Sequence, residues 1–236
     1  MKFLIESGFR VEVSAATRRP THAGAVSHCR MTQAVLASSG RPSRRMLALG
    51  GIVGPVGFVA AWAAGAVRSD DLSPVRDAIS RLAAVGAQTR PLMSTGFVAF
   101  GVGVPIYAAA LRQVVPGPAW ITATVTGLAT TGVALAPLDH SSAVDSLHAA
   151  FAVLGYVTLA ATPLLAYRPL MRSGHLLLAR VGAIAGTVAG TSLLLSSVGD
   201  LGGLFQRLGL TAGDVWIVAS AVAILSGRLT APITSS

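Results

Sequence analysis

Residues 46–67 read MLALGGIVGPVGFVAAWAAGAV, an apolar run that lies between Arg45 and Arg68 and contains no charged side chain. A helix that crosses the hydrocarbon core of a bilayer needs about 20 predominantly apolar residues. This run therefore predicts a membrane-spanning helix. Pro55 does not argue against it, because neighbouring helices in a membrane satisfy the carbonyl group that a proline leaves free.

Five further apolar stretches follow the first. The six predicted helices are about 46–67, 91–111, 115–138, 147–167, 179–198 and 208–227. The last contains Asp214 about one turn inside its start, and we expect this carboxyl group to reach the lipid head groups beside Trp216. A membrane β-barrel is disfavoured because the stretches show no alternation of polarity. The predicted fold class is all-α, a polytopic membrane bundle of six transmembrane helices.

Composition agrees with a surface that faces lipid. Charged residues make up 11% of the 236 residues, whereas about 25% is usual in soluble domains. The net charge of +9 does not indicate nucleic acid, because the basic residues lie in the N-terminal segment and in short loops, as membrane topology requires. Membrane lipids are the expected partners. The single cysteine, Cys29, excludes an internal disulfide.

The two ends of the chain are polar. Residues 1–45 lack a sustained apolar pattern, and we expect a disordered, basic cytoplasmic tail. The alternative is a translation start at Met31 or Met46. Residues 46–228 form the predicted transmembrane domain, and residues 229–236 form a short C-terminal tail. The basic cluster at 41–45 predicts a multi-pass protein of the cell membrane with both termini in the cytoplasm.

Short motifs lie between the predicted helices. DAISRL (77–82) follows the first helix, APLD (136–139) ends the third, His148 opens the fourth, and GLFQRL (203–208) precedes the last. Their order resembles the membrane-protein family known as domain of unknown function 998, in which an Ile-Ser-x-Leu element, a Pro-x-Asp, a histidine and a Gly-Leu-x-x-Arg follow one another. The resemblance covers about residues 46–228. It implies a six-helix prokaryotic membrane protein of unassigned activity.

Ionisable side chains gather at the predicted outer surface. The candidate metal ligands are Asp139, His140, Asp145 and His148, since histidine and carboxylate ligate Zn and other divalent metals. Ser80, Asp139 and His148 are the candidate catalytic residues of a membrane-surface hydrolase. Their residue types resemble those of membrane hydrolases that act on ceramides and related lipids. Those enzymes carry paired histidines four residues apart on a late helix, and this chain lacks them.

A structural interpretation of the same residues is favoured. Asp139 would end the third helix, Asp145 would cap the fourth with His148 in its first turn, and Asp77 would cap a short interfacial helix. Arg81 and Arg207 would pair with nearby aspartates and tie the loops together. The alternative is that Asp77, Arg81 and Arg207 bind an anionic lipid head group.

Glycines recur every four residues at Gly182, Gly186 and Gly190. This spacing makes a flat stripe on which another helix can pack closely. Packing inside the bundle is the favoured interpretation. The alternative is a seam between two copies of the chain, which would make a homo-oligomer.

The sequence is compatible with two functions. The favoured one is a non-catalytic bundle without a cofactor that interacts with lipid or a small solute through its outward polar face. It rests on the expectation that no helix interior carries an unpaired charge, whereas ion- and proton-coupled transporters need one. The alternative is an enzyme, the hydrolase that uses Asp139, His148 and Ser80, with or without a divalent metal such as Zn.

Overall fold

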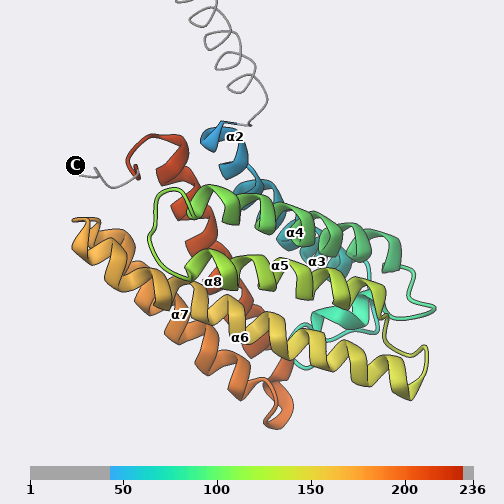
Figure 1. The fold of residues 1–236 in the computed structure, drawn as a ribbon. Helices are drawn as coiled ribbons and strands as arrows, with labels where there is room; N and C mark the ends of the chain where they lie inside the picture. The colour runs from blue at the N-terminus through green and yellow to red at the C-terminus, as the bar shows by residue number, and fades with distance from the viewer. Residues whose placement is uncertain (1–42, 231–236) are drawn as a thin grey trace, which may run out of the picture. The chain divides into compact units, whose positions relative to one another are not determined.

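The computed structural model describes residues 43–230, which form a bundle of helices and contain no strand (Figure 1). In chain order the elements are α2 (Arg44–Ala48), α3 (Gly50–Val67), the 3₁₀ helix η1 (Ile79–Ala83), α4 (Arg90–Leu111), α5 (Ala119–Leu135), α6 (Ser142–Arg172), α7 (Leu176–Leu195), the 3₁₀ helix η2 (Gly199–Leu201) and α8 (Gly202–Leu225). The disordered tail expected over residues 1–45 lies outside the described residues except for its last three, which begin α2 with Ser43 as its cap.

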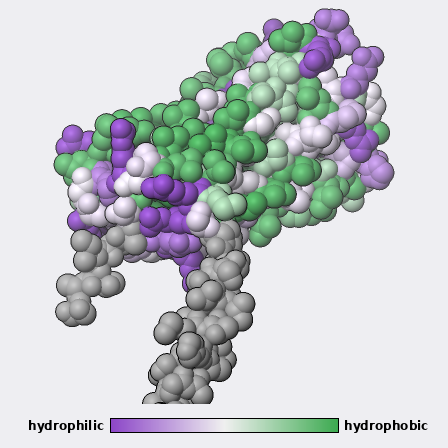
Figure 2. Space-filling model, turned by 90° about the horizontal axis from the view of Figure 1, so that it is seen from above, coloured by the Kyte–Doolittle hydropathy of each residue, from purple (hydrophilic) through white to green (hydrophobic). Residues whose placement is uncertain are grey.

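The bundle has the dimensions and surface of a membrane domain. Within residues 43–230, five stretches are long and apolar enough to span a membrane: Arg44–Val67, Arg90–Leu111, Ser142–Arg172, Leu176–Leu195 and Gly199–Leu225. The sixth helix, α5, has 17 residues, a length of about 26 Å, which is at the lower limit for a span. Figure 2 shows a broad apolar face between hydrophilic residues at the two ends. The chain is an integral, multi-pass, all-helical membrane protein.

Prolines explain why α5 is shorter than the predicted helix 115–138. Pro116, Gly117 and Pro118 form the turn that precedes it, with Gly117 at φ +100°. Pro137 ends it, because the residue before a proline is driven out of the α region, and Ala136 has φ −113° and ψ 75°. The neighbouring helix α6 is longer than predicted, since Arg168 and Arg172 remain within it at its far end.

Glycine allows α3, α4 and α5 to approach one another at backbone distance. A Cβ atom added to Gly103 of α4 would lie 2.7 Å from the carbonyl oxygen of Gly50 and 2.9 Å from Cα of Gly54. On the other side of α4, Gly127 of α5 packs against the ring of Pro105, where an added Cβ would be 2.3 Å from Cδ. Small residues at such contacts provide van der Waals packing where lipid supplies no hydrophobic driving force.

The predicted glycine stripe on α7 packs inside the same chain. Gly182 lies against Trp216 of α8, whereas Gly186 lies against Leu164 and the carbonyl oxygen of Ala160 on α6. An added Cβ on Gly190 would meet Cβ of Ala160 at 3.7 Å, an ordinary van der Waals contact. The stripe thus serves two neighbouring helices.

Each membrane helix packs against the next one in sequence, and α8 closes the bundle by contacting α3 as well as α7. Gly227, just after α8, lies beside the guanidinium group of Arg45, 3.7 Å from an added Cβ. The first and last helices therefore share one end of the bundle, which we call the terminal end. The opposite end carries η1 and the α5–α6 connection and is called the η1 end.

Candidate functional site

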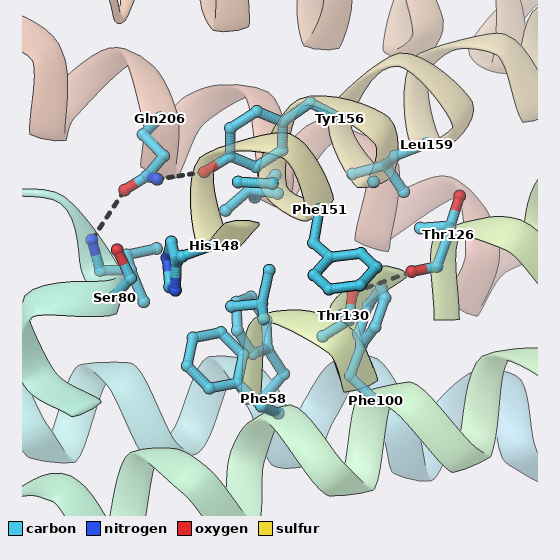
Figure 3. Close-up of a pocket in the computed structure, with 16 residues that line it drawn as sticks. Phe58, Ser80, Phe100, Thr126, Thr130, His148, Phe151, Tyr156, Leu159 and Gln206 are labelled. Atoms are coloured by element: carbon cyan, nitrogen blue, oxygen red, sulfur yellow. Dashed lines mark hydrogen bonds between the residues drawn. The ribbon is translucent and has the colours of Figure 1, made fainter. Parts of the chain in front are cut away.

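A cavity of about 50 Å³ lies inside the bundle near the η1 end (Figure 3). Helices α3, α4, α5 and α6 and the 3₁₀ helix η1 contribute most of its wall, and α8 contributes the remaining residues. Its lining comprises Phe58, Ile79, Ser80, Phe97, Phe100, Thr126, Thr130, Val133, His148, Phe151, Ala152, Gly155, Tyr156, Leu159, Gln206 and Leu210. A space of this size admits a few water molecules or a molecule of about three or four non-hydrogen atoms.

Gln206 organises the polar part of the cavity. Its Oε1 accepts a hydrogen bond from the backbone N–H of Ile79 at 2.7 Å, and its Nε2 donates to the hydroxyl group of Tyr156 (Figure 3). One buried amide thus joins α8 to η1 and to α6, and it fixes the backbone beside Ser80. Gln206 carries no signal of this role in the sequence, because residues 203–207 are predicted to form a loop, whereas α8 begins at Gly202.

His148 is oriented by the end of α5. Its Nδ1 lies 2.7 Å from the carbonyl oxygen of Ala136, which belongs to the last turn of α5 and lacks a helical partner. A carbonyl oxygen only accepts, so Nδ1 carries the proton in the neutral ring and Nε2 keeps a lone pair. Within residues 43–230, neither Nε2 nor the Ser80 hydroxyl has a hydrogen-bond partner, and both residues line the cavity.

Aromatic rings form the apolar part of the wall. The ring centroid of Phe58 lies 5.7 Å from that of Phe97 and 5.4 Å from that of Phe100, in tilted arrangements that favour aromatic pairs. Phe151 of α6 lies across the cavity from Phe58 in Figure 3. The cavity is therefore amphipathic, with hydrogen-bonding groups near η1 and rings deeper in the bundle.

Asp139 belongs to a separate, more exposed groove. Arg81 donates from Nη1 to both carboxylate oxygens of Asp139 at 3.0 Å, with the two side chains 47% and 51% exposed. Arg68, Asp70 and Asp71 also line this groove, whereas His148 does not. The structure thus brings Ser80 and His148 to one cavity but leaves Asp139 outside it, so the three predicted catalytic residues do not form a triad.

The four candidate metal ligands are likewise dispersed. Asp139 pairs with Arg81, His148 with the Ala136 carbonyl group, and His140 is exposed. Asp145 accepts a hydrogen bond from the backbone N–H of Asp139 at 3.0 Å. Among residues 43–230, no group of three His, Cys, Asp or Glu side chains is placed to hold a metal ion.

Two predicted helix caps were wrong. Ser141, rather than Asp145, caps α6, and its hydroxyl accepts from the N–H of Val144 at 3.4 Å. Asp77 does not cap η1. Its Oδ2 accepts from the N–H of Ser73 at 2.7 Å and so closes the preceding turn. Before η1 and before α6, the chain turns earlier than predicted. The carboxylates of Asp77 and Asp145 each stabilise the turn by accepting a backbone hydrogen bond.

Arg207 connects the first loop to α8 through hydrogen bonds to backbone carbonyl groups rather than through the predicted ion pair. Its Nη1 donates to the carbonyl oxygens of Pro74 at 2.7 Å, Asp77 at 2.8 Å and Gly203 at 3.0 Å. Its guanidinium carbon lies 5.6 Å from the ring centroid of Trp62, a cation–π contact. Arg81, by contrast, forms the expected ion pair with an aspartate.

The position predicted for Asp214 was also wrong. Because α8 begins at Gly202 rather than at residue 208, Asp214 lies about three turns inside the helix instead of at its start. Its side chain is 3% exposed, and neither carboxyl oxygen has a hydrogen-bond partner within the described part of the chain. The expectation that no helix interior holds an unpaired ionisable group is therefore incorrect.

The family model described as protein of unknown function (DUF998) matches residues 52–223. The chain belongs to the DUF998 family. No curated protein and no solved structure matches the chain. The DUF998 match includes every residue that lines the cavity, as well as Asp214. Membership confirms the resemblance carried by the loop motifs, and it assigns no activity.

Proposed function

We propose that this protein binds a small neutral amphipathic molecule, a single-chain alcohol, in the cavity near η1. The observation that carries the proposal is that one enclosed space combines the free groups of Ser80 and His148 with a wall of phenylalanine rings. Mostly apolar sites with a few placed polar groups are typical of small-molecule binding. This function needs no catalytic step and no cofactor.

The charges around the cavity favour a hydroxyl group over an anionic head group. No arginine or lysine lines the cavity, so a carboxylate or phosphate would lose its hydration without gaining a cation. A hydroxyl group would donate to the lone pair of His148 Nε2 and accept from Ser80. The apolar body of the ligand would then lie along Phe58, Phe100 and Phe151.

Filling the cavity should abolish binding. Ala152 lines the cavity, and Ala152→Leu adds three carbon atoms to that wall. The measurement is the thermal stability of the protein in lipid nanodiscs with and without 1-propanol. At about ten times Kd the ligand should stabilise the wild type by about 1.4 kcal/mol, and this gain should disappear in the variant.

The control is Ala150→Leu, the same substitution on α6 at an exposed position. It should keep the response to 1-propanol, and propionate should give a weaker response than 1-propanol in the wild type. An equal response in both variants would show that 1-propanol acts through the lipid, which contradicts the proposed site.

A second function, hydrolysis at Ser80, is favoured by one specific observation. The Ala136 carbonyl group orients the neutral ring of His148 so that Nε2 carries no proton, as a general base requires. This nitrogen lies in the same cavity as a serine hydroxyl group.

A fluorophosphonate probe tests the hydrolase function directly. Ser80 Oγ would attack phosphorus, fluoride would leave, and the hydroxyl proton would pass to His148. Labelling that is lost in Ser80→Ala but kept in Ser146→Ala, a change of an exposed serine on α6, would support the enzyme. An unlabelled wild type would exclude it as a serine hydrolase of this kind.

We also propose that the terminal end faces the cytoplasm. The basic residues Arg44 and Arg45 beside the first helix support this orientation. Gly227 lies next to Arg45, so the end of the last helix is on the same side of the membrane. Alkaline phosphatase, which is active only outside the cytoplasm, should be inactive when fused after Ser236 and active when inserted in the loop at Gly86. The reverse pattern would invert the topology.

A further inference from the structure

Asp214 is an acidic side chain placed where a membrane protein can least accommodate one. It lies in the middle of α8, is 3% exposed, and has no hydrogen-bond partner for either oxygen within residues 43–230. Burying an unpaired carboxylate costs much more free energy than burying an apolar group of similar size. Packing alone therefore gives no reason for a carboxyl group here, whereas a bound cation would.

The face of α8 that carries Asp214 points toward α3. Arg207, Asp214 and Ala221 are seven residues apart and so share one side of the helix. Arg207 lies over the ring of Trp62, and Ala221 lies 2.9 Å from an added Cβ on Gly51. Because both neighbours in this row contact α3, Asp214 faces the part of α3 between them.

The carboxyl group is one helical turn from the cavity. Leu210 lies four residues before Asp214 on the same side of α8 and lines the cavity, whereas Asp214 does not. Leu210 is thus the residue of the cavity wall nearest to Asp214 along this side of α8. A path for water from the cavity to the carboxyl group along α8 would require this side chain to move.

Among residues 43–230, no other charged group lies on the parts of the helices that pack against the middle of α8, and Arg207, on the same side of α8 as Asp214, is about two turns earlier. α3 contains no ionisable side chain between Gly50 and Val67, and α7 contains none after Arg180. The Tyr107 hydroxyl of α4 is bonded to Ser220, and the ionisable residues of α6 in this half, His148 and Tyr156, are engaged at the cavity. The two arginines of α2 lie at the terminal end.

The isolation of the carboxyl group decides which cation it suits. Metal ions such as Ca²⁺ or Mg²⁺ require several oxygen ligands, and in the described part of the chain Asp214 belongs to no group of three His, Cys, Asp or Glu side chains that could hold a metal ion. A proton needs a single carboxylate oxygen. We propose that Asp214 is a proton-binding site in the middle of the bundle and that it exchanges its proton through the cavity when Leu210 moves aside. The O–H bond of the carboxylic acid breaks, the proton passes to a water molecule from the cavity, and a carboxylate and a hydronium ion remain.

Infrared spectroscopy of the full chain in lipid nanodiscs tests the proposal. The wild type at neutral pH should show the carbonyl stretch of a protonated carboxylic acid, and Asp214→Asn should lack it. After transfer to D₂O the band should shift slowly in the wild type and about ten-fold faster in Leu210→Ala, which opens the path from the cavity. Leu208→Ala, the same change at a half-exposed position of α8, should leave the exchange rate unchanged.

Three results would overturn the proposal: no such band in the wild type, a band that persists in Asp214→Asn, or equal exchange in the two leucine variants. If Asp214→Asn does not fold, Asp214→Glu provides the assignment, because it should keep the band at a shifted frequency. An unchanged frequency would then count against Asp214. The proton site does not depend on the alcohol site, since loss of 1-propanol binding in Ala152→Leu leaves the assignment of the band intact.

Discussion

Replacing Gly103 by alanine should strongly destabilise the bundle. The added Cβ would lie 2.7 Å from the Gly50 carbonyl oxygen and 2.9 Å from Gly54 Cα, and these are backbone atoms that cannot rotate away. Relief requires α3 and α4 to separate along their contact. Overpacking of a well-packed interior costs about 1–3 kcal/mol, and we expect the upper end of this range because both contacts involve backbone.

The matched control is Gly190→Ala, where the added Cβ would meet only Cβ of Ala160 at 3.7 Å. This change should alter the free energy of unfolding by no more than about 0.5 kcal/mol. The measurement is thermal unfolding in detergent together with the yield of monodisperse protein. Equal behaviour of the two variants would mean that α3 and α4 are not in the close contact described.

The helices were predictable from sequence because the signal is strong and local. Six apolar stretches separated by charges have few interpretations, and all six appear in the structure. Their ends were less predictable. Charged residues are poor markers of these ends, because Arg168, Arg172 and Arg207 lie inside helices. Long arginine side chains allow this, since they carry their charge to a polar partner or to the membrane surface.

This error in the ends had a large effect on the interpretation of function. Starting the last helix at residue 208 put Asp214 near the surface and Gln206 in a loop. Because α8 begins at Gly202, Asp214 is a buried carboxyl group inside the bundle. Gln206 lies on the first turns of the same helix and forms hydrogen bonds to neighbouring elements. Glycines 202 and 203 were read as a loop, yet here they allow the start of α8 to approach the first loop, where an added Cβ on Gly203 would lie 2.5 Å from the Asp77 carbonyl oxygen.

The candidate site was only partly predictable, because side-chain convergence depends on tertiary contacts. Ser80 and His148 were singled out by residue type, and the structure brings both to one cavity. Asp139 is nine residues from His148 in sequence, but its backbone has φ +64° and its side chain turns toward Arg81. Nearness in sequence was therefore a poor guide. The aromatic wall carries no motif, because its phenylalanines come from three separate helices, α3, α4 and α6, and no spacing in the sequence indicates that they meet.

Gln206→Leu should loosen the η1 end of the bundle and impair the cavity. The substitution keeps the approximate size of the side chain but removes both hydrogen bonds, leaving the N–H of Ile79 and the hydroxyl group of Tyr156 without their partner. Each buried polar group left unpaired costs about 1–3 kcal/mol, so the free energy of unfolding should fall by about 2–6 kcal/mol. Because Ile79 adjoins Ser80, the polar side of the cavity should lose its geometry as well.

Gln113→Leu provides the comparison, since Gln113 is exposed and its amide only donates to the nearby Ala109 carbonyl group at 3.2 Å. It should change the free energy of unfolding by less than about 0.5 kcal/mol. Hydrogen exchange then separates a local effect from a global one. In Gln206→Leu, the amides of η1 should exchange faster than those of α4 and α5, because η1 is held to α8 by this side chain and by the Arg207 contacts to the preceding loop. Uniformly faster exchange throughout the bundle would show that Gln206 supports the whole fold, and unchanged exchange at η1 would show that its two hydrogen bonds do not anchor the cavity wall.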